Sequence, residues 1–280
     1  MIKLFISIVC FLSLFLQSNA QSENFSTLEC LYIHKYVSDT TAVEMSMNGE
    51  FDGGDSAYIY TEYFILSCGG PVSEFRSFDR MIADSALSYN EYSDLFSGNS
   101  YNLKSGSRLR IYKDVNNITT IQPISFDWFR IVENIPDFGW EVCDEWKNVA
   151  GYNARMARCS FRGREYIVWF TSEIPISEGP WKFTGLPGLI VEVCDVECEY
   201  YYRLISLRRK NTQIEFLNEN MLDLSQEKFN KRLRMYIEDV VRYMSMTYSG
   251  PISYADKDGN PIDPESLKKV MKFDFEEIVF

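Results

Sequence analysis

Short runs of β-branched and aromatic residues, each bounded by Gly, Asn, Asp or Pro, recur along most of this chain. Such runs are typical of β-strands, because these side chains pack well on a pleated, half-buried surface. The brief connections between the runs favour antiparallel neighbours. The pattern predicts a β-rich α+β fold, either a curved antiparallel sheet or a partly open barrel of many short strands. The clearest runs are residues 27–37, 56–68, 107–115, 118–124, 126–133, 165–171, 188–195 and 200–207.

Two turns punctuate this pattern. "RGR" between Phe161 and Glu165 predicts a tight turn, so that residues 154–170 form a β-hairpin. In "TGLPGLI", Pro187 suits the second position of a type II turn and Gly188 the third, where a positive φ is required. A strand-like "LIVEV" follows, whereas a phosphate cradle would need a helix there. We therefore interpret Gly185, Pro187 and Gly188 first as a structural turn.

Helical spacing is clearest in residues 223–244, near the C-terminus. Asp223 and Gln226 have the spacing of a capping box at the start of a helix. The apolar positions fit one face of an amphipathic helix laid on the sheet, namely Phe229, Leu233, Tyr236, Ile237, Val240 and Met244. Residues 79–96 predict a second, weaker helix.

The first twenty residues have the pattern of a signal peptide. Lys3 precedes the apolar run "LFISIVCFLSLFL", and "SNA" offers small residues before a cut after Ala20. The run is shorter than the roughly 20 residues of a membrane span, although an uncleaved anchor is the alternative. We expect residues 1–20 to be removed and residues 21–280 to form a single domain that is periplasmic or secreted. No other stretch is apolar enough to cross a bilayer.

The net charge of the chain limits the classes of molecule that it is expected to bind. The chain has 28 Lys and Arg against 40 Asp and Glu, a net charge of −12. An acidic protein is repelled by phosphate backbones and anionic lipid surfaces, so nucleic acid is not an expected partner.

Six cysteines remain after processing, and an even number in an exported chain suggests disulfides. A hairpin loop at "DVE" would bring Cys194 and Cys198 within the roughly 4.4–6.8 Å between α-carbons that a disulfide requires, whereas an extended segment would not. The candidates are Cys30, Cys68, Cys143, Cys159, Cys194 and Cys198.

Most catalytic constellations are missing from the sequence. His34 is the only histidine, and it lies within a strand-like run, where an ordinary structural histidine is favoured over a general base. The zinc, nucleophile-elbow and phosphate-loop motifs do not occur. We therefore expect neither a metal nor a cofactor. Hydrolysis by two carboxylates stays open, because it needs only two correctly spaced acids.

Residues 151–193, "GYNARMARCSFRGREYIVWFTSEIPISEGPWKFTGLPGLIVEV", resemble the GLPGLI family of exported proteins of Gram-negative bacteria. "FRGRE", "WFTSEIPI", "GPWKF" and the "GLPGLI" run itself carry the resemblance. The resemblance implies a secreted or periplasmic protein associated with outer-membrane TonB-dependent transport. It carries over no catalytic residues.

The matching segment nevertheless contains a candidate ligand pocket, because aromatic and polar residues alternate before a rigid turn. Its residues would be Arg164, Trp169, Glu173, Trp181 and Lys182. The alternative is structural: both tryptophans pack in the core, and Arg164 pairs with Glu173.

Three hypotheses follow. The first is a non-enzymatic binding or accessory protein of the cell envelope, with an outer-membrane transporter or another envelope protein as partner. The second is a secreted hydrolase that uses paired carboxylates. The third is a structural envelope component, which would self-associate.

Overall fold

The computed structural model describes residues 24–37, 43–45, 51–53, 59–84, 95, 106–197, 199–217, 220–249, 253, 261 and 263. The expected signal peptide and Cys198 lie outside these residues. Among the residues described, no helix is both long enough and apolar enough to span a membrane.

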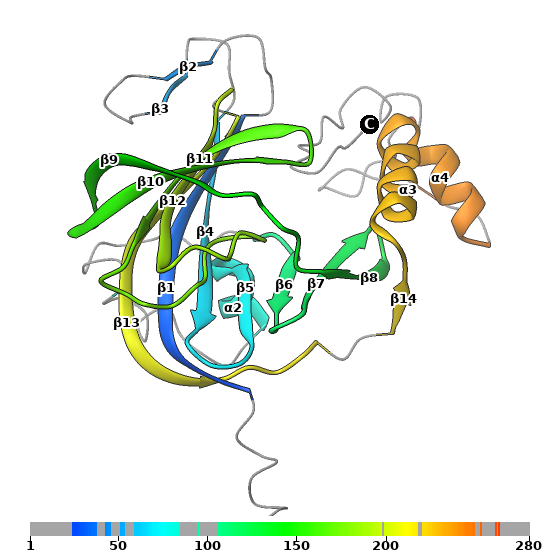
Figure 1. Ribbon diagram of the computed structural model, residues 1–280. Helices are drawn as coiled ribbons and strands as arrows, with labels where there is room; N and C mark the ends of the chain where they lie inside the picture. Colours follow the sequence, from blue (N-terminus) through cyan, green and yellow to red (C-terminus); the bar gives the residue numbers. More distant parts are fainter. Residues whose placement is uncertain are drawn as a thin grey trace, which may run out of the picture.

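Twelve strands form one open sheet, which confirms the predicted β-rich fold (Figure 1). Their order is β14-β8-β7-β6-β5-β4-β1-β13-β12-β11-β10-β9, and all neighbours are antiparallel except the parallel pair β14 and β8. The long strands β1 and β13 bend along their length, so that the sheet curves around a concave side. The strands are β1 Phe25–Val37, β4 Ile59–Cys68, β5 Ser73–Ser77, β6 Arg110–Lys113, β7 Asn117–Ile124, β8 Asp127–Asn134, β9 Glu141–Val149, β10 Tyr152–Phe161, β11 Arg164–Thr171, β12 Leu189–Asp195, β13 Tyr200–Gln213 and β14 Met221–Asp223; β2 Val43–Met45 and β3 Phe51–Gly53 pair separately.

The main hydrophobic core lies on the concave side. Leu28, Cys30 and Tyr32 alternate along β1 and are buried there, as the two-residue period of a strand requires. The segment 172–188, which connects β11 to β12, folds back into this core. Its side chains Trp181, Phe183 and Leu186 are nearly inaccessible to solvent, so this segment fills the inside of the sheet.

The predicted hairpin at residues 154–170 is confirmed. β10 and β11 pair from Arg155 with Phe170 to Phe161 with Arg164. Arg162 and Gly163 form the two-residue turn, with φ of 50° and 78°. Two consecutive positive φ values match the twist of the flanking strands, which explains why this turn needs a glycine.

The C-terminal helical region differs from its prediction. It contains two helices, α3 Gln226–Glu238 and α4 Val240–Thr247, with Asp239 between them. Ser225, and not Asp223, caps α3 by accepting a hydrogen bond from the backbone N–H of Lys228. Asp239 leaves helical geometry and caps α4 through the N–H of Arg242, which ends the first helix.

This break has a packing reason. Val240, Tyr243 and Met244 join Phe229 in a core against Phe129 of β8 and its neighbours. A single straight helix could not lay both segments on the end of the sheet. The weaker predicted helix at 79–96 is observed as α2 Phe78–Asp84, which packs against β4 and β5 on the face of the sheet opposite the main core. Residues 85–94 lie outside the described part.

Strand β9 forms one edge of the sheet, and its pairing is interrupted. Trp146 lies opposite Arg155 and Val142 opposite Ala157, so residues 143–145 face a single residue of β10. A bulge with the exposed Asp144 bends the edge and places charge on it. Such features protect an edge strand from pairing with another chain.

Candidate functional site

The segment 172–188 is held in place by a buried lysine that the sequence did not single out. Lys113, at the end of β6, donates hydrogen bonds from Nζ to the carbonyl oxygens of Gly179 (2.8 Å) and Phe183 (3.1 Å). Its ammonium also pairs with Glu178 Oε2 at 2.6 Å. Because Lys113 is only 2% exposed, one buried charge fixes both ends of the "GPWKF" turn.

The "GLPGLI" turn is closed differently from the expected type II turn. The N–H of Gly188 donates to the carbonyl of Leu186, and the N–H of Leu189 donates to the carbonyl of Ile174. Gly188 has a φ of 155°, and a Cβ there would lie 2.2 Å from the carbonyl oxygen of Thr171. Gly188 is therefore required by the close approach of two backbone segments, and Gly185 by its φ of 95°.

Trp181 and Lys182 lie together beneath the surface. Trp181 contacts the rings of Phe161 and Phe183, as the structural alternative predicts for this tryptophan. Lys182 is fully buried, and its Nζ lies 3.0 Å from Glu133 Oε2 of β8 and 3.4 Å from Gln226 Oε1 of α3.

Glu133 also forms an ion pair with a second cation. Arg162 lies 2.5 Å from its other carboxylate oxygen. Burial by itself would raise the pKa of Glu133, but the charges of Lys182 and Arg162 outweigh it and hold that pKa below its ordinary value. The Glu133 node therefore joins three parts of the chain: the β10–β11 turn, the 172–188 segment and the start of α3.

The other predicted pocket residues lie elsewhere. Arg164 pairs with Asp195 (2.9 Å), Glu197 (3.3 Å) and Glu199 (2.5 Å). Glu173 instead accepts a hydrogen bond from the backbone N–H of Asn153, so the expected pair between Arg164 and Glu173 is wrong.

Trp169 is half-buried and packs against the main core, as the structural alternative predicts. It alternates along β11 with the buried Val168 and Phe170, and its ring lies 4.3 Å from the ammonium of Lys147. The structure thus brings Trp181 and Lys182 together but does not gather the five candidates into one pocket.

Asp195, Glu197 and Glu199 place carboxylate oxygens within 4.8 Å of one another. The Arg164 guanidinium already lies among them and stacks 4.6 Å over the ring of Tyr200. These acids are therefore balanced by a side chain of the protein itself.

A row of polar residues crosses the sheet on one face. Five residues lie directly opposite one another on consecutive strands, in the order Tyr112, Glu74, Ser67, Glu29, Arg208. Two of them are buried carboxylates, with Glu29 1% and Glu74 4% exposed. Hydrolysis by two carboxylates needs a pair of acids, so the groups in contact with Glu29 and Glu74 decide whether these two residues suit that role.

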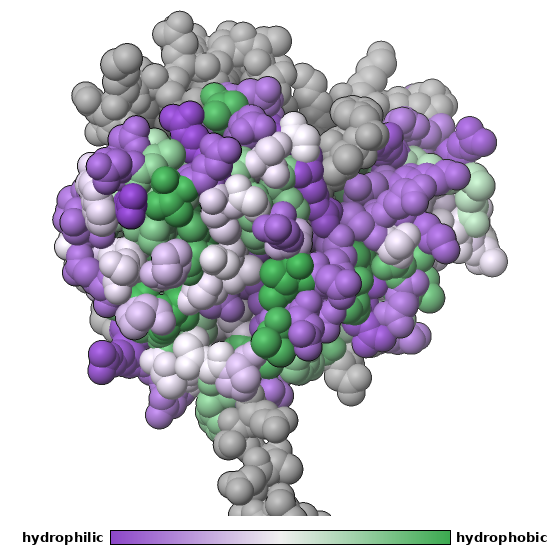
Figure 2. Space-filling model, in the orientation of Figure 1, coloured by the Kyte–Doolittle hydropathy of each residue, from purple (hydrophilic) through white to green (hydrophobic). Residues whose placement is uncertain are grey.

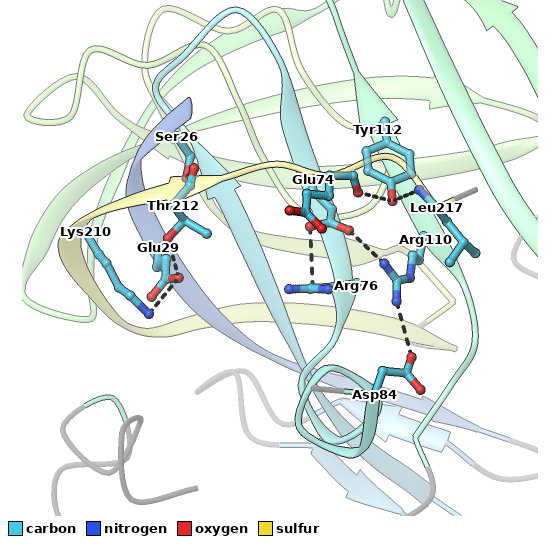
Figure 3. A network of polar contacts seen from close by, with 11 residues as sticks. Ser26, Glu29, Glu74, Arg76, Asp84, Arg110, Tyr112, Lys210, Thr212 and Leu217 are labelled. Atoms are coloured by element: carbon cyan, nitrogen blue, oxygen red, sulfur yellow. Dashed lines mark hydrogen bonds and ion pairs between the residues drawn. The ribbon is translucent and has the colours of Figure 1, made fainter. Parts of the chain in front are cut away.

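Both carboxylates are surrounded by cations (Figure 3). Glu29 accepts from Arg208 Nε and Thr212 Oγ1, each at 2.9 Å, and lies 3.5 Å from Lys210. Glu74 lies 3.5 Å from Arg76 and from Arg110, which also bonds Asp84. Both carboxylates are therefore members of ion-pair networks within the sheet, and such networks are typical of a structural role.

His34 is a core residue on β1. It is 7% exposed and stacks on Tyr202 at 4.1 Å, nearly parallel. Burial lowers its pKa to about 3, and its Nε2 has no hydrogen-bond partner. The neutral imidazole is packed as an aromatic ring, which fits a structural histidine better than a general base.

Five of the candidate cysteines are free thiols in the structure: Cys30, Cys68, Cys143, Cys159 and Cys194. Cys30 and Cys68 are buried on the neighbouring strands β1 and β4, with their thiols in hydrogen-bond contact. Pairing of Cys194 with Cys198 falls outside the described residues and stays a prediction.

Three clefts on the described surface lie beside the C-terminal helices. A cleft of about 650 Å³ lies between β7, β8 and residues 216–217 and 223–225. A second, of about 510 Å³, lies between α3 and residues 106–109 and 122–126, and a third, of about 470 Å³, lies between α3, α4, Asp127 and Leu222. Six of the thirteen large hydrophobic residues exposed on the described surface line these clefts: Phe126, Val132, Phe216, Leu222, Met235 and Met246. On the face shown in Figure 2, hydrophobic side chains form separate patches among hydrophilic ones.

Comparison with known proteins adds a family match over part of the chain. Residues 161–192, which contain β11, the 172–188 segment and the start of β12, match a family described as "protein of unknown function (Porph_ging)". No curated protein matches the chain. The match therefore links residues 161–192 to an uncharacterised family, and these residues lie within the segment that carries the sequence resemblance.

Solved structures give only distant similarity. PNGF-II in its P21 crystal form is 11% identical, with a TM-score of 0.44 over 74% of this chain and 32% of its own, and its C2 form gives 0.43. An uncharacterized conserved protein from Thermus thermophilus is 5% identical, with a TM-score of 0.32 over 72% of this chain and 91% of its own. This chain spans about a third of the length of PNGF-II. These values assign neither an activity nor a ligand to it.

Proposed function

We propose that this protein is an exported, non-enzymatic binding or accessory protein of the bacterial cell envelope. The observation that carries the proposal is the contrast between an interior that is filled by the protein's own side chains and a surface on which apolar side chains stay exposed. The 172–188 segment fills the concave side of the sheet, while exposed apolar side chains gather around clefts near α3 and α4. Such an arrangement suits recognition of another molecule at the surface.

The state of the charged groups supports a role without catalysis. Lys113, Lys182 and Arg164 each have carboxylate partners, as do the cations around Glu29 and Glu74. The single histidine is buried and neutral. Catalytic acids and bases are usually groups with a tuned protonation state in a cleft. In the cleft of about 650 Å³, the charged residues are Arg130 and Asp223, which pair with each other.

Export and the envelope partner rest on the sequence. The N-terminal pattern supports a cleaved signal peptide, and the family resemblance supports association with outer-membrane transport. We infer that the partner is an envelope protein, with a TonB-dependent transporter as the leading candidate.

The test is crosslinking in intact cells, followed by purification of the tagged chain and mass spectrometry. The expected result is a processed chain that begins after Ala20 and recovers an envelope protein. A chain with the signal region deleted is the matched control, because it cannot meet that partner. Recovery of no envelope protein by the exported chain would overturn the proposal.

A further inference from the structure

The C-terminal helices carry the exposed surface that best suits a protein partner. We propose that α3 and α4, with the cleft between them and Leu222, bind an acidic protein segment that carries apolar side chains. This inference rests on the proposed function and names the surface and the chemistry of the partner.

The apolar part of this surface is built from three side chains. Leu222, Met235 and Met246 are 53%, 39% and 65% exposed, and all three line the cleft of about 470 Å³. Methionine is flexible and polarizable, so it adapts to the shape of an incoming side chain. The cleft floor includes the buried Tyr243, which fixes its depth.

The cleft itself is lined by one acid and one base, Asp127 and Arg232, but the two helices beside it are mainly positive. Lys228, Lys231, Arg232 and Met235 share one face of α3 at i, i+3, i+4 and i+7, and Arg242 lies one turn before Met246 on α4. Lys228, Lys231 and Arg242 are exposed. Over residues 226–247 five basic residues face three acidic ones, although the whole chain has a net charge of −12: Lys228, Lys231, Arg232, Arg234 and Arg242 against Glu227, Glu238 and Asp239. A basic patch on an acidic protein selects an acidic partner by charge complementarity.

A protein segment fits this surface better than an anionic membrane. The exposed apolar residues line concave clefts, which accept protruding side chains, whereas a membrane-binding helix presents a continuous apolar face. The inner apolar face of α3 is already used, since Phe229 packs on Phe129 with ring centroids 5.8 Å apart. The net negative charge of the chain also opposes an anionic lipid surface.

The surface is anchored to the family-matched segment. Lys182 of that segment reaches Gln226 in the first turn of α3, and Ser225 caps the helix. A docking surface on rigid, capped helices loses little conformational entropy on binding. The 172–188 segment thus supports α3 from within the protein and is not itself part of the proposed contact surface.

The test places a photoreactive phenylalanine analogue at Met235 or Met246 of the full exported chain in cells. Ile205 on β13 is the matched control site, because it is 39% exposed, as Met235 is. The expected result is crosslinking from both methionine sites, but not from Ile205, to an acidic segment of an envelope protein. The crosslinked peptides are identified by mass spectrometry.

A second comparison tests the charge argument. Lys231→Glu with Arg242→Glu is expected to reduce crosslinking from Met246 at least about fivefold. Arg158→Glu with Arg209→Glu makes the same change in net charge on exposed sheet positions and is expected to leave the yield unchanged. Equal loss in both double variants would overturn the inference, because it would reflect overall charge alone.

The remaining outcomes separate the two proposals. Crosslinks to an envelope protein from Ile205 alone would keep the proposed function and overturn this surface. Crosslinks only to lipid, to the same chain or to a second copy would overturn the inference as stated. No crosslink from any site, together with no partner in the pull-down, would overturn both.

Discussion

The buried Lys182 forms an ion pair with the half-buried Glu133, with Nζ 3.0 Å from the carboxylate oxygen, and this pair ties the family-matched segment to strand β8. Arg162 approaches the same carboxylate from the β10–β11 turn. One acid on β8 thus balances two cations that lie well beyond it in the sequence. The pair lies below α3, so its loss should be felt both in stability and at the docking surface.

Lys182→Met should destabilise the protein by roughly 1 to 3 kcal/mol, since it leaves the half-buried carboxylate of Glu133 with Arg162 as its remaining charge partner. Chemical denaturation of the purified mature chain measures this loss. Glu133→Gln should cost less when Lys182 is already Met than in the wild-type chain, because the two residues are coupled. Additive losses in the double variant would show that the pair contributes no interaction energy.

Lys113→Met should be at least as damaging, at roughly 3 to 5 kcal/mol, because Glu178 loses its ammonium partner and two carbonyl groups lose a donor. The native fold should also loosen locally, with faster amide exchange in residues 179–183. Arg130→Met is the comparison, since its pair with Asp223 is largely exposed and should matter far less. Similar effects of the two substitutions would contradict the role of burial.

The strand pattern and the β10–β11 hairpin were predictable because they depend on local sequence. Alternation along β11 and the Arg162–Gly163 turn are set by neighbouring residues, whereas the requirement for glycine at Gly188 comes from the approach of the Thr171 backbone. The break at Asp239 was not predictable from helical periodicity, because that periodicity continues across it. Capping by Asp239 and packing against β8 decide the break, and both need the tertiary structure.

The grouping of polar residues depended on strand order, which the sequence does not reveal. Arg164 meets Asp195 and Glu199 because β11, β12 and β13 are adjacent, and Glu29 meets Arg208 because β13 pairs with β1. Glutamates within otherwise apolar strands were an available signal. Glu29 in "LEC" and Glu74 in "VSEF" each imply a cation across the sheet, although they do not say which one.

Gly188→Ala should destabilise the protein strongly, by more than about 3 kcal/mol, because the added Cβ would meet the backbone oxygen of Thr171 at 2.2 Å. Gly163→Ala is the matched control: it also has a positive φ, of 78°, but nothing lies within 4 Å of its Cβ position. Only the backbone strain of roughly 1 to 2 kcal/mol should appear there. Thermal unfolding of the two variants distinguishes a steric role for Gly188 from a purely conformational one.

His34 should make the protein less stable as the pH falls below 6.5. Burial lowers the pKa of His34 to about 3 in the folded protein, from an ordinary value of 6.5. The unfolded chain therefore binds a proton that the folded chain excludes. The stability of the folded state is unaffected by this proton above pH 6.5, and it decreases as the pH falls toward 3. The loss should approach about 1.4 kcal/mol for each pH unit below 6.5.

His34→Phe isolates this effect, because phenylalanine can keep the stacking on Tyr202 and has no unpartnered nitrogen. At pH 7.5 the variant should be as stable as the wild type or more stable, since a buried polar atom without a partner is removed. Between pH 6.5 and 5, where most carboxylates stay ionised, the wild type should lose stability and the variant should not. Denaturation midpoints at several pH values measure both curves, and parallel curves in that window would mean that His34 becomes protonated without opposing the fold.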